Sequence, residues 1–153
     1  MVCFDGCDMK LTIELVPSTC FESNLRSVLS RSDWDKIRKS TYEKAGHVCE
    51  ICGGKGSRHP VECHEIWEYD DKSHVQKLVG LQALCPKCHM VKHYGRTREQ
   101  GLEQVALAHL CKVNNIDEHT AYQHVLNAFL VWENRSIYEW KQDTSFMEDP
   151  PHG

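Results

Sequence analysis

Two CxxC pairs constrain this 153-residue chain more than any other feature. Cys49 and Cys52 form the first pair, Cys85 and Cys88 form the second, and 32 residues lie between them. Two thiolates on a tight turn such as "CEICGG" can bind one ion together, and two such turns supply the four ligands of a closed tetrahedral zinc site. A redox site needs only one pair, so the spacing favours a structural zinc over free thiols or a redox couple.

The rest of the composition agrees with a metal-binding role for these cysteines. The chain holds nine cysteines, and its start lacks the basic segment and apolar run of a signal peptide. No window approaches the apolar length that a membrane span needs. We therefore expect a soluble cytoplasmic protein whose cysteines are metal ligands or free thiols rather than disulfides.

Charge is distributed unevenly along the chain. The net charge is −4, which gives no overall attraction to nucleic acid. Residues 85–98 nevertheless carry four Lys or Arg and no Asp or Glu, whereas residues 99–153 carry three basic and nine acidic residues. A local basic patch can bind phosphate even on an acidic protein, provided that the acidic third faces away.

Hydrophobic periodicity predicts an α+β fold. Residues 10–17, "KLTIELVP", alternate apolar and polar side chains, which predicts a strand with one buried face that ends at Pro17. Apolar residues at helical spacing after Ser32 predict a helix that stops at Gly46. Residues 59–67 and 77–85 are rich in β-formers, so we expect a two-stranded antiparallel ribbon with a polar loop over residues 68–76.

The remainder of the chain is predicted to be mainly helical. Pro86 begins a helix of two to three turns, and Gly95 is expected to end it. Apolar stripes over residues 102–113 and 121–132 predict two further helices, and residues 136–140, "SIYEW", are a candidate for a last strand.

His89 and His93 stand apart from the cysteines in their predicted role. They lie four residues apart on the helix after the second pair, so they project from one face. Because four thiolates already complete a tetrahedral site, the two histidines are free for a second metal or phosphate site, with Cys63 and His64 as facing groups. The alternative is that they are a capping residue and a surface residue.

The order of these motifs resembles the zinc-knuckle branch of the HNH endonucleases, whose fold is called ββα-metal. The resemblance covers residues 47–95, and "LQALCPKCHMVKH" is its most specific part. It implies a zinc-stapled ββα-metal core, which we place at residues 31–98. Together with the periodicity above, this leaves an N-terminal extension with one strand over residues 1–30 and a C-terminal helical extension, a helical pair, over residues 99–153.

The resemblance also implies site residues. His64 matches the general base that takes a proton from the attacking water, and His89 and His93 match ligands of a catalytic divalent ion such as Mg²⁺, Mn²⁺, Ni²⁺ or Zn²⁺. Cys63 occupies the position of the third ligand, where a thiolate favours zinc, nickel or cobalt. The alternative for His64 is a satisfied histidine within the ribbon.

Three positions depart from the family's pattern. Gly80 stands where the family has the Asn that orients the base, Cys63 replaces the usual Asp or His, and Trp67 replaces a common Pro. Asn24 or His74 could substitute for the missing Asn. Adjacent strand residues point to opposite faces, so Cys63 and His64 can reach one site only through a twist or bulge.

These features lead to two main functional expectations. The first is a metal-dependent endonuclease of low sequence specificity, whose contacts with DNA phosphates come from Lys55, Arg58, Lys87, Lys92, Arg96 and Arg98.

The second expectation is a catalytically inactive zinc module that binds a protein or nucleotide, as an inhibitor or regulator. In that case the C-terminal helices with Trp132, Tyr138 and Trp140 provide a recognition surface, and core packing is the ordinary alternative for these aromatic residues. A zinc-dependent DNA-binding regulator is a weaker third reading, because no helix with base-reading side chains stands out.

Overall fold

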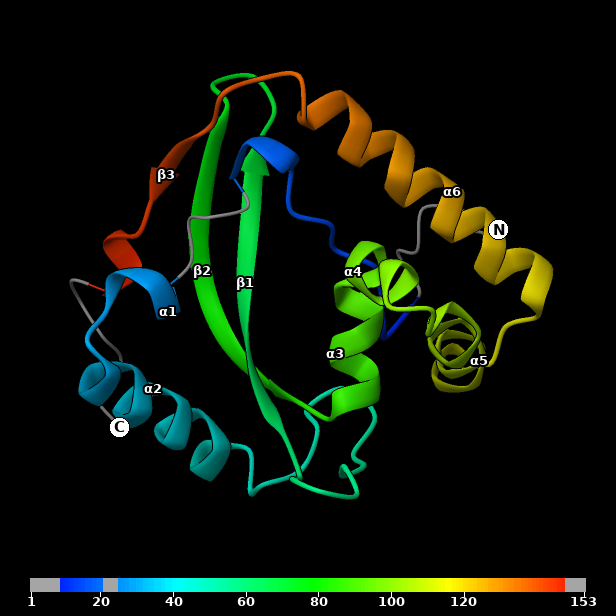
Figure 1. The fold of residues 1–153 in the computed structure, drawn as a ribbon, viewed down its shortest axis with the longest axis horizontal. Coiled ribbons are helices and arrows are strands. Elements are labelled where there is room, and N and C mark those ends of the chain that lie inside the picture. Colours follow the sequence, from blue (N-terminus) through cyan, green and yellow to red (C-terminus); the bar gives the residue numbers. More distant parts are fainter. Residues whose placement is uncertain (1–8, 21–24, 148–153) are drawn as a thin grey trace.

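The computed structural model describes residues 9–20 and 25–147. Their fold is α+β, with a small sheet and helices on both of its faces (Figure 1). In chain order the elements are α1 (Leu25–Val28), α2 (Arg31–Lys44), β1 (Glu62–Asp70), β2 (Val75–Leu84), α3 (Pro86–Lys92), α4 (Tyr94–Glu99), α5 (Glu103–Asn114), α6 (Glu118–Arg135) and β3 (Lys141–Asp143), with short 3-10 turns at Ser18–Cys20 and Ser145–Met147.

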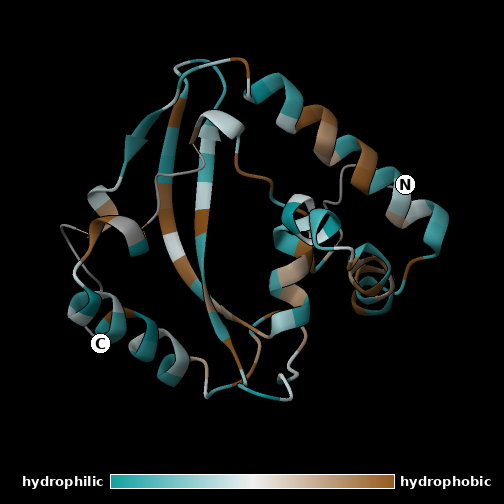
Figure 2. Cartoon of the chain, in the orientation of Figure 1, coloured by the Kyte–Doolittle hydropathy of each residue, from teal (hydrophilic) through white to brown (hydrophobic). Residues whose placement is uncertain are grey.

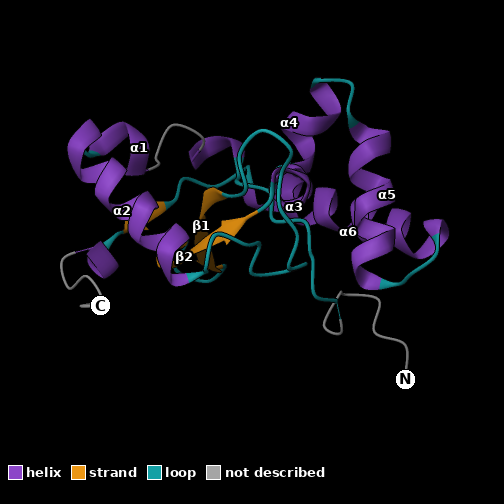
Figure 3. Cartoon of the chain, turned by 90° about the horizontal axis from the view of Figure 1, so that it is seen from below, coloured by secondary structure: helices purple, strands orange, loops and turns teal. Residues whose placement is uncertain are grey.

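The sheet is built around the predicted ribbon. Strands β1 and β2 pair antiparallel, with Glu62 opposite Leu84 and Asp70 opposite Val75, and the short β3 joins β2 in parallel. The register shifts between Ile66 and Trp67, which is the site of a bulge. Figure 3 shows α1 and α2 on one side of the sheet and α3 to α6 on the other.

The loop of the ribbon is shorter than residues 68–76. Both strands continue to Asp70 and Val75, and only four residues make the turn. The Asp70 carboxylate accepts hydrogen bonds from the backbone N–H groups of Lys72 and Ser73, and His74 adopts a positive φ of 57°. Because the Asp70 side chain closes this turn within a few residues, polar residues 68–70 remain paired with β2.

The segment at residues 10–17 is extended but is not a strand, so the predicted N-terminal strand is wrong. The alternation does bury Leu11 and Ile13, whose exposed fractions are 0% and 7%. Their backbone N–H groups donate to the side chains of Asn114 and His124 instead of to a neighbouring strand. Side chains of α5 and α6 therefore satisfy these two backbone N–H groups and hold the segment against the helices.

The helix after Pro86 breaks earlier than predicted. Helix α3 ends at Lys92, His93 leaves the helical region at φ −101° and ψ 50°, and α4 begins at Tyr94. Gly95 lies inside α4, so the expectation that it ends the helix is wrong. The backbone N–H of His93 still donates to the carbonyl of His89, which keeps these two histidines one turn apart.

The other predicted helices are present. Helix α2 begins after Ser30, whose hydroxyl accepts from the N–H of Asp33, and it ends before Gly46. Helices α5 and α6 match the two apolar stripes, while residues 136–140 are irregular and β3 begins just after them. Figure 2 shows hydrophobic and hydrophilic residues alternating along α5 and α6, as expected for helices with one buried face.

The main core lies between α3, the N-terminal segment and the C-terminal helices. It includes Leu11, Leu84, Val91, Tyr94 and Leu110, all with exposed fractions of 0%. This core fixes α3, and with it both candidate sites, against the sheet. Of the helices that the structure describes, none is long and apolar enough to cross a bilayer.

Candidate metal centres

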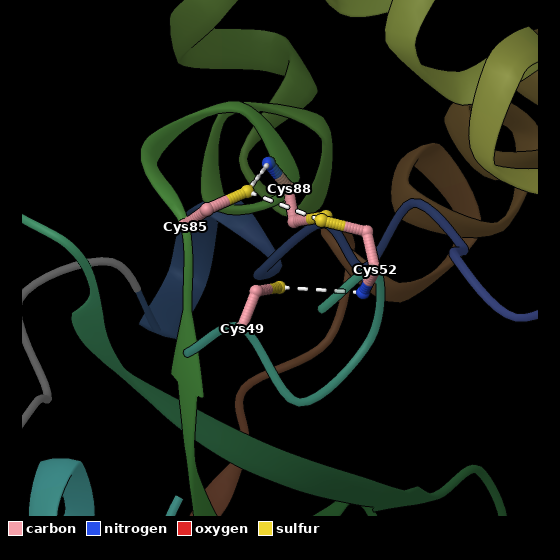
Figure 4. Close-up of side chains that lie close together, drawn as sticks. All are labelled: Cys49, Cys52, Cys85 and Cys88. Carbon is pink, nitrogen blue, oxygen red and sulfur yellow. Dashed lines mark hydrogen bonds between the residues drawn. The ribbon is translucent and has the colours of Figure 1, made fainter. Parts of the chain in front are cut away.

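The four cysteines of the two CxxC pairs come together as predicted. Their sulfur atoms all lie within 4.8 Å of one another, and the Sγ atoms of Cys52 and Cys85 are 3.6 Å apart (Figure 4). A tetrahedral zinc with bonds of about 2.3 Å places its sulfur ligands about 3.8 Å apart. The group is therefore of the right kind and size to hold one metal ion.

Local backbone geometry aims these sulfurs inward. The N–H of Cys52 donates to Cys49 Sγ at 3.5 Å, and the N–H of Cys88 donates to Cys85 Sγ at 3.4 Å. Gly53 takes a positive φ of 76°, which closes the first turn at little steric cost. A Cβ on Gly56 would lie 2.7 Å from Pro86 Cδ, so glycine is needed where the first loop crosses the start of α3.

The thiols of this group perturb one another strongly. Hydrogen bonding from Cys88 lowers the pKa of Cys49, while burial and the Cys49 thiolate raise the pKa of Cys85. The pKa of Cys88 is also raised, first by its hydrogen bond to Cys49 and then by burial. Four thiolates this close repel one another, and a bound cation removes that repulsion.

His109 belongs to the surroundings of this group, and the sequence analysis missed it. Its Nε2 lies 3.1 Å from Cys88 Sγ, close enough to donate a hydrogen bond to a thiolate. Such outer partners orient a ligand and tune its affinity for the metal. His109 lies on α5, so a contact between it and Cys88 ties the cysteine group to the C-terminal helices.

His64, His89 and His93 form a second group that could hold a metal ion. One ring nitrogen from each lies within 4.8 Å of the others, and the ring centroids are 4.8 to 5.4 Å apart. His64 comes from β1, His89 from α3 and His93 from the break after α3. Because β1 packs against α3 here, His64 meets two histidines that lie 25 or more positions later in the chain.

His64 is the most constrained member of this histidine group. It is 3% exposed, and neither of its ring nitrogens has a hydrogen-bond partner among the described residues. A buried polar atom without a partner is costly, and a ligand or ion commonly explains it. Burial lowers the pKa of His64, and burial together with the neighbouring His89 and His64 lowers the pKa of His93 to about 3. Both rings are therefore neutral near pH 7, which is the form that binds metal or accepts a proton.

Two carboxylates flank the histidine group, and no local spacing pointed to either. Glu62 Oε1 lies 2.9 Å from His89 Nδ1, which leaves Nε2 of that ring facing away from the carboxylate. Glu14 Oε1 lies 3.7 Å from His64 Nε2, and the other oxygen of Glu14 pairs with Lys92. Burial alone would raise the pKa of Glu14, but the nearby His64 and Lys92 lower it to about 2.

The structure separates Cys63 from the histidines. Pairing is regular from Glu62 to Ile66, so no bulge lies between Cys63 and His64, and their side chains point to opposite faces. Cys63 contacts Thr41 and Tyr42 of α2, and burial raises its pKa to about 11. Its thiol stays protonated there, so the site has Glu14 and Glu62 nearby instead of a third ligand from position 63.

Neither proposed substitute for the missing Asn is placed in the site. His74 lies in the turn at the far end of the ribbon, where its ring stacks on Tyr138 with centroids 4.1 Å apart. Asn24 falls outside the described residues. Gly80 pairs with Ile66 in the ribbon, and the Glu14 carboxylate lies 3.7 Å from the His64 ring.

The six predicted phosphate contacts divide into two sets. Lys55, Arg58, Lys87 and Arg96 are exposed. Lys92 differs from them, because it is only 4% exposed and pairs with Glu14; these contacts favour a structural role over the predicted DNA contact. Arg98 is exposed as well, but it already pairs with Glu103 and lies 4.3 Å from the centre of the Phe129 ring.

The C-terminal aromatic residues pack within the chain. Trp132 Nε1 donates to the carbonyl of Val16, and Trp140 Nε1 donates to that of Arg135. Trp140 also meets Tyr69 edge to face, with centroids 5.4 Å apart. These contacts fit the packing alternative for Trp132 and Trp140, whereas Tyr138 stacks on His74 but is 45% exposed.

Comparison of the chain with protein-family models, curated proteins and solved structures finds no match.

Proposed function

We propose that this protein is a metal-dependent endonuclease of the HNH type that hydrolyses phosphodiester bonds in DNA. The observation that carries the proposal is the group of His64, His89 and His93, in which neither ring nitrogen of the buried His64 makes a hydrogen bond with a described residue. This group is separate from the four cysteines, so one chain offers a thiolate site and an imidazole site. Closed thiolate sites typically serve structure, whereas imidazole sites with open positions serve chemistry.

The cysteine group holds a structural Zn²⁺ in this proposal. Four thiolates leave no open coordination position, and soft sulfur ligands select zinc over magnesium. The ion would join the turn at residues 49–52 to the start of α3, and α3 carries His89. Zinc binding thus positions the second site without taking part in its reaction.

The histidine group holds the second divalent ion, and His89 and His93 are its ligands. An ion bound there stabilises negative charge on the phosphate and on the leaving oxygen. His64 acts as the general base: it accepts a proton from the water whose oxygen attacks phosphorus, while the bond from phosphorus to the leaving oxygen breaks. Glu62 orients His89 through Nδ1, and Glu14 faces the ring of His64.

The second candidate function is a catalytically inactive metal module that binds a protein or nucleotide partner. Gly80 and the distance of Cys63 from the histidines favour it, because two groups of the family's pattern are missing from the site. In this alternative the metal sites only stabilise the fold. DNA cleavage distinguishes the two functions directly.

The test is nicking of supercoiled plasmid by protein that keeps its structural zinc but has lost any other metal. Mg²⁺, Mn²⁺, Co²⁺, Ni²⁺ and Zn²⁺ are added in turn to the wild type, His64→Ala, His89→Ala and His119→Ala. His119 is an exposed histidine of α6 and serves as the matched control. The proposal expects nicking by the wild type and His119→Ala, and at least a 100-fold loss in the other two. Absence of cleavage with every ion, or equal cleavage by all four proteins, would show that the site is not catalytic.

The same variants separate two roles of His64. If His64 is the base, His64→Ala binds the second ion with nearly unchanged affinity and loses only the rate. If it is the third ligand, the affinity for the ion falls as well. Titration of each variant with the most active ion measures this difference.

A further inference from the structure

A basic groove lies beside the cysteine group, distinct from the histidine site. It has a volume of about 770 Å³ and is formed by residue 10, the loop over residues 51–59, the start of α3 and the end of α5. Five cationic side chains line it: Lys10, Lys55, Arg58, Lys87 and Lys112. Sequence reasoning found three of them, but Lys10 and Lys112 lie far from the others along the chain.

No carboxylate neutralises the charge in this groove. Two ligands of the proposed zinc site, Cys52 and Cys85, also line it, and four thiolates around one Zn²⁺ leave a net negative charge, which the five cations outnumber. All five cationic residues are exposed, and the ion pairs between described residues include none of them. Of the described residues that line the groove, none is Asp or Glu. The whole chain carries a net charge of −4, so this concentration of positive charge runs against the overall composition. Like charges held together cost stability, which is commonly offset by a bound anion.

The groove is shaped by rigid parts of the fold. Gly56 packs so closely on His59 and Pro86 that a Cβ there would lie 2.2 Å from the His59 carbonyl oxygen. Lys10 precedes Leu11, whose backbone donates to and accepts from the side chain of Asn114. The cations are therefore carried on segments that the cysteine group and α5 already hold in place, so little ordering is needed when a ligand binds.

The surface between the cations is partly apolar and partly formed by imidazole rings. Ile51, Pro86 and Val113 give it apolar area, and His59 and His109 add two imidazole rings. A free phosphate or a simple acidic side chain would leave this area unused. A nucleic-acid strand offers phosphates at regular intervals together with sugars and base faces, which suits spread charges with apolar surface between them.

The groove is also connected to the histidine site. His59 lines the groove, and its Nε2 lies 2.7 Å from Glu62 Oε2. The other oxygen of Glu62 contacts His89 Nδ1. One carboxylate thus separates the edge of the groove from a proposed metal ligand, so a polymer in the groove would extend toward the histidines.

From these observations we infer that the groove binds the sugar–phosphate backbone of a nucleic-acid strand, and holds it so that a neighbouring phosphodiester reaches the histidine site. This inference rests on the proposed function for its second part only. Phosphate contacts of this kind position the polymer and do not read its sequence.

The binding test uses the full zinc-loaded chain and a fluorescently labelled oligonucleotide without added divalent ion. Anisotropy gives the affinity of the wild type, of Lys55→Glu/Lys87→Glu, and of the matched double variant Lys36→Glu/Lys44→Glu on α2, across the sheet from α3. All four lysines are exposed, and both double variants change the net charge equally. We expect the groove variant to bind at least about tenfold more weakly near 50 mM salt, and its salt dependence to fall by about 1.4 to 1.8 in slope, because two phosphate contacts are lost. The α2 variant should bind like the wild type.

Competition identifies the ligand. An unlabelled oligonucleotide should displace the labelled strand at concentrations at which a mononucleotide and a poly-glutamate peptide do not. Equal weakening of both double variants, or equal competition by the mononucleotide or the peptide, would overturn the inference. So would absence of oligonucleotide binding by the wild type.

A small substrate separates this inference from the proposed function. Bis(p-nitrophenyl) phosphate carries one phosphodiester and cannot span the groove. The groove variant should hydrolyse it at the wild-type rate while nicking plasmid more slowly at limiting DNA. Normal hydrolysis with normal plasmid nicking would refute the groove. Specific oligonucleotide binding with no hydrolysis of either substrate would refute the nuclease and leave the groove standing as a binding site.

Discussion

Replacement of Lys92 by Met tests whether this lysine serves stability rather than DNA binding. Its side chain is 5% exposed, its Nζ pairs with Glu14, and it also donates to Thr12 Oγ1 at 3.2 Å. Met keeps most of the length of the stem but removes the charge. The change therefore leaves the Glu14 carboxylate without its main partner.

The expected loss follows from the burial of the pair. Removing one partner of a fully buried ion pair costs about 3–5 kcal/mol. The Glu14 side chain is 38% exposed, so water compensates for part of the lost interaction. We therefore expect the free energy of unfolding to fall by about 2 kcal/mol. For a chain of this size that corresponds to a melting temperature lower by about 4–8 °C.

Urea denaturation of zinc-loaded protein measures this change, and oligonucleotide binding is measured on the same samples. Glu14→Gln/Lys92→Met should regain at least about 1 kcal/mol, because no charge is then left unpaired. DNA affinity should stay within about twofold of the wild type. Unchanged stability together with an affinity as weak as that of Lys55→Glu/Lys87→Glu would refute the reasoning, because Lys92 would then contact DNA.

Three other changes probe the two metal centres and the core. Glu62→Gln should weaken binding of the second ion by about 10- to 100-fold, because His89 loses the carboxylate that orients it; titration with Mn²⁺ or Co²⁺ measures this, and unchanged affinity would contradict the role. His109→Ala should raise the rate of zinc loss to a chelator by about tenfold, since Cys88 loses its hydrogen bond; an equal rate would mean that the contact is incidental. Leu110→Ala should lower the free energy of unfolding by about 3 kcal/mol in urea, because this side chain is fully buried in the main core. A loss under 1 kcal/mol would show that the core there is loosely packed.

The cysteine group was predictable because its information is local. Each CxxC pair fixes the geometry of one turn, and the only long-range requirement is that two turns meet. The ribbon between them begins near one pair and returns to the other, which brings the two turns together. His89 and His93 followed from helical spacing, and His64 from its place in the strand between the pairs.

The N-terminal segment illustrates what periodicity leaves open. Alternation correctly identified Leu11 and Ile13 as buried, but it carries no information on what satisfies the backbone between them. In the structure those partners are side chains of α5 and α6, more than 100 residues away. An extended segment and a strand have the same sequence pattern when the partner is a side chain.

Glu14 and Glu62 could not be assigned for a related reason. Glu14 reaches His64 only because the N-terminal segment is held against the helices, and Glu62 meets His89 only through the packing of α3 on β1. Lys92, by contrast, could have been recognised as buried. It lies four residues after Cys88, on the same face of α3 as that predicted zinc ligand.

The number of divalent ions bound per chain shows whether the histidines form a second metal centre. Zinc-loaded protein is titrated with Mn²⁺ or Co²⁺ and its metal content is measured, for the wild type, for His89→Ala and for the exposed control His119→Ala. We expect one tightly held zinc in all three proteins, and a second ion in the wild type and the control that is lost in His89→Ala. A wild type that binds no second ion, or a second ion that His89→Ala retains with full affinity, would contradict a metal centre at the histidines.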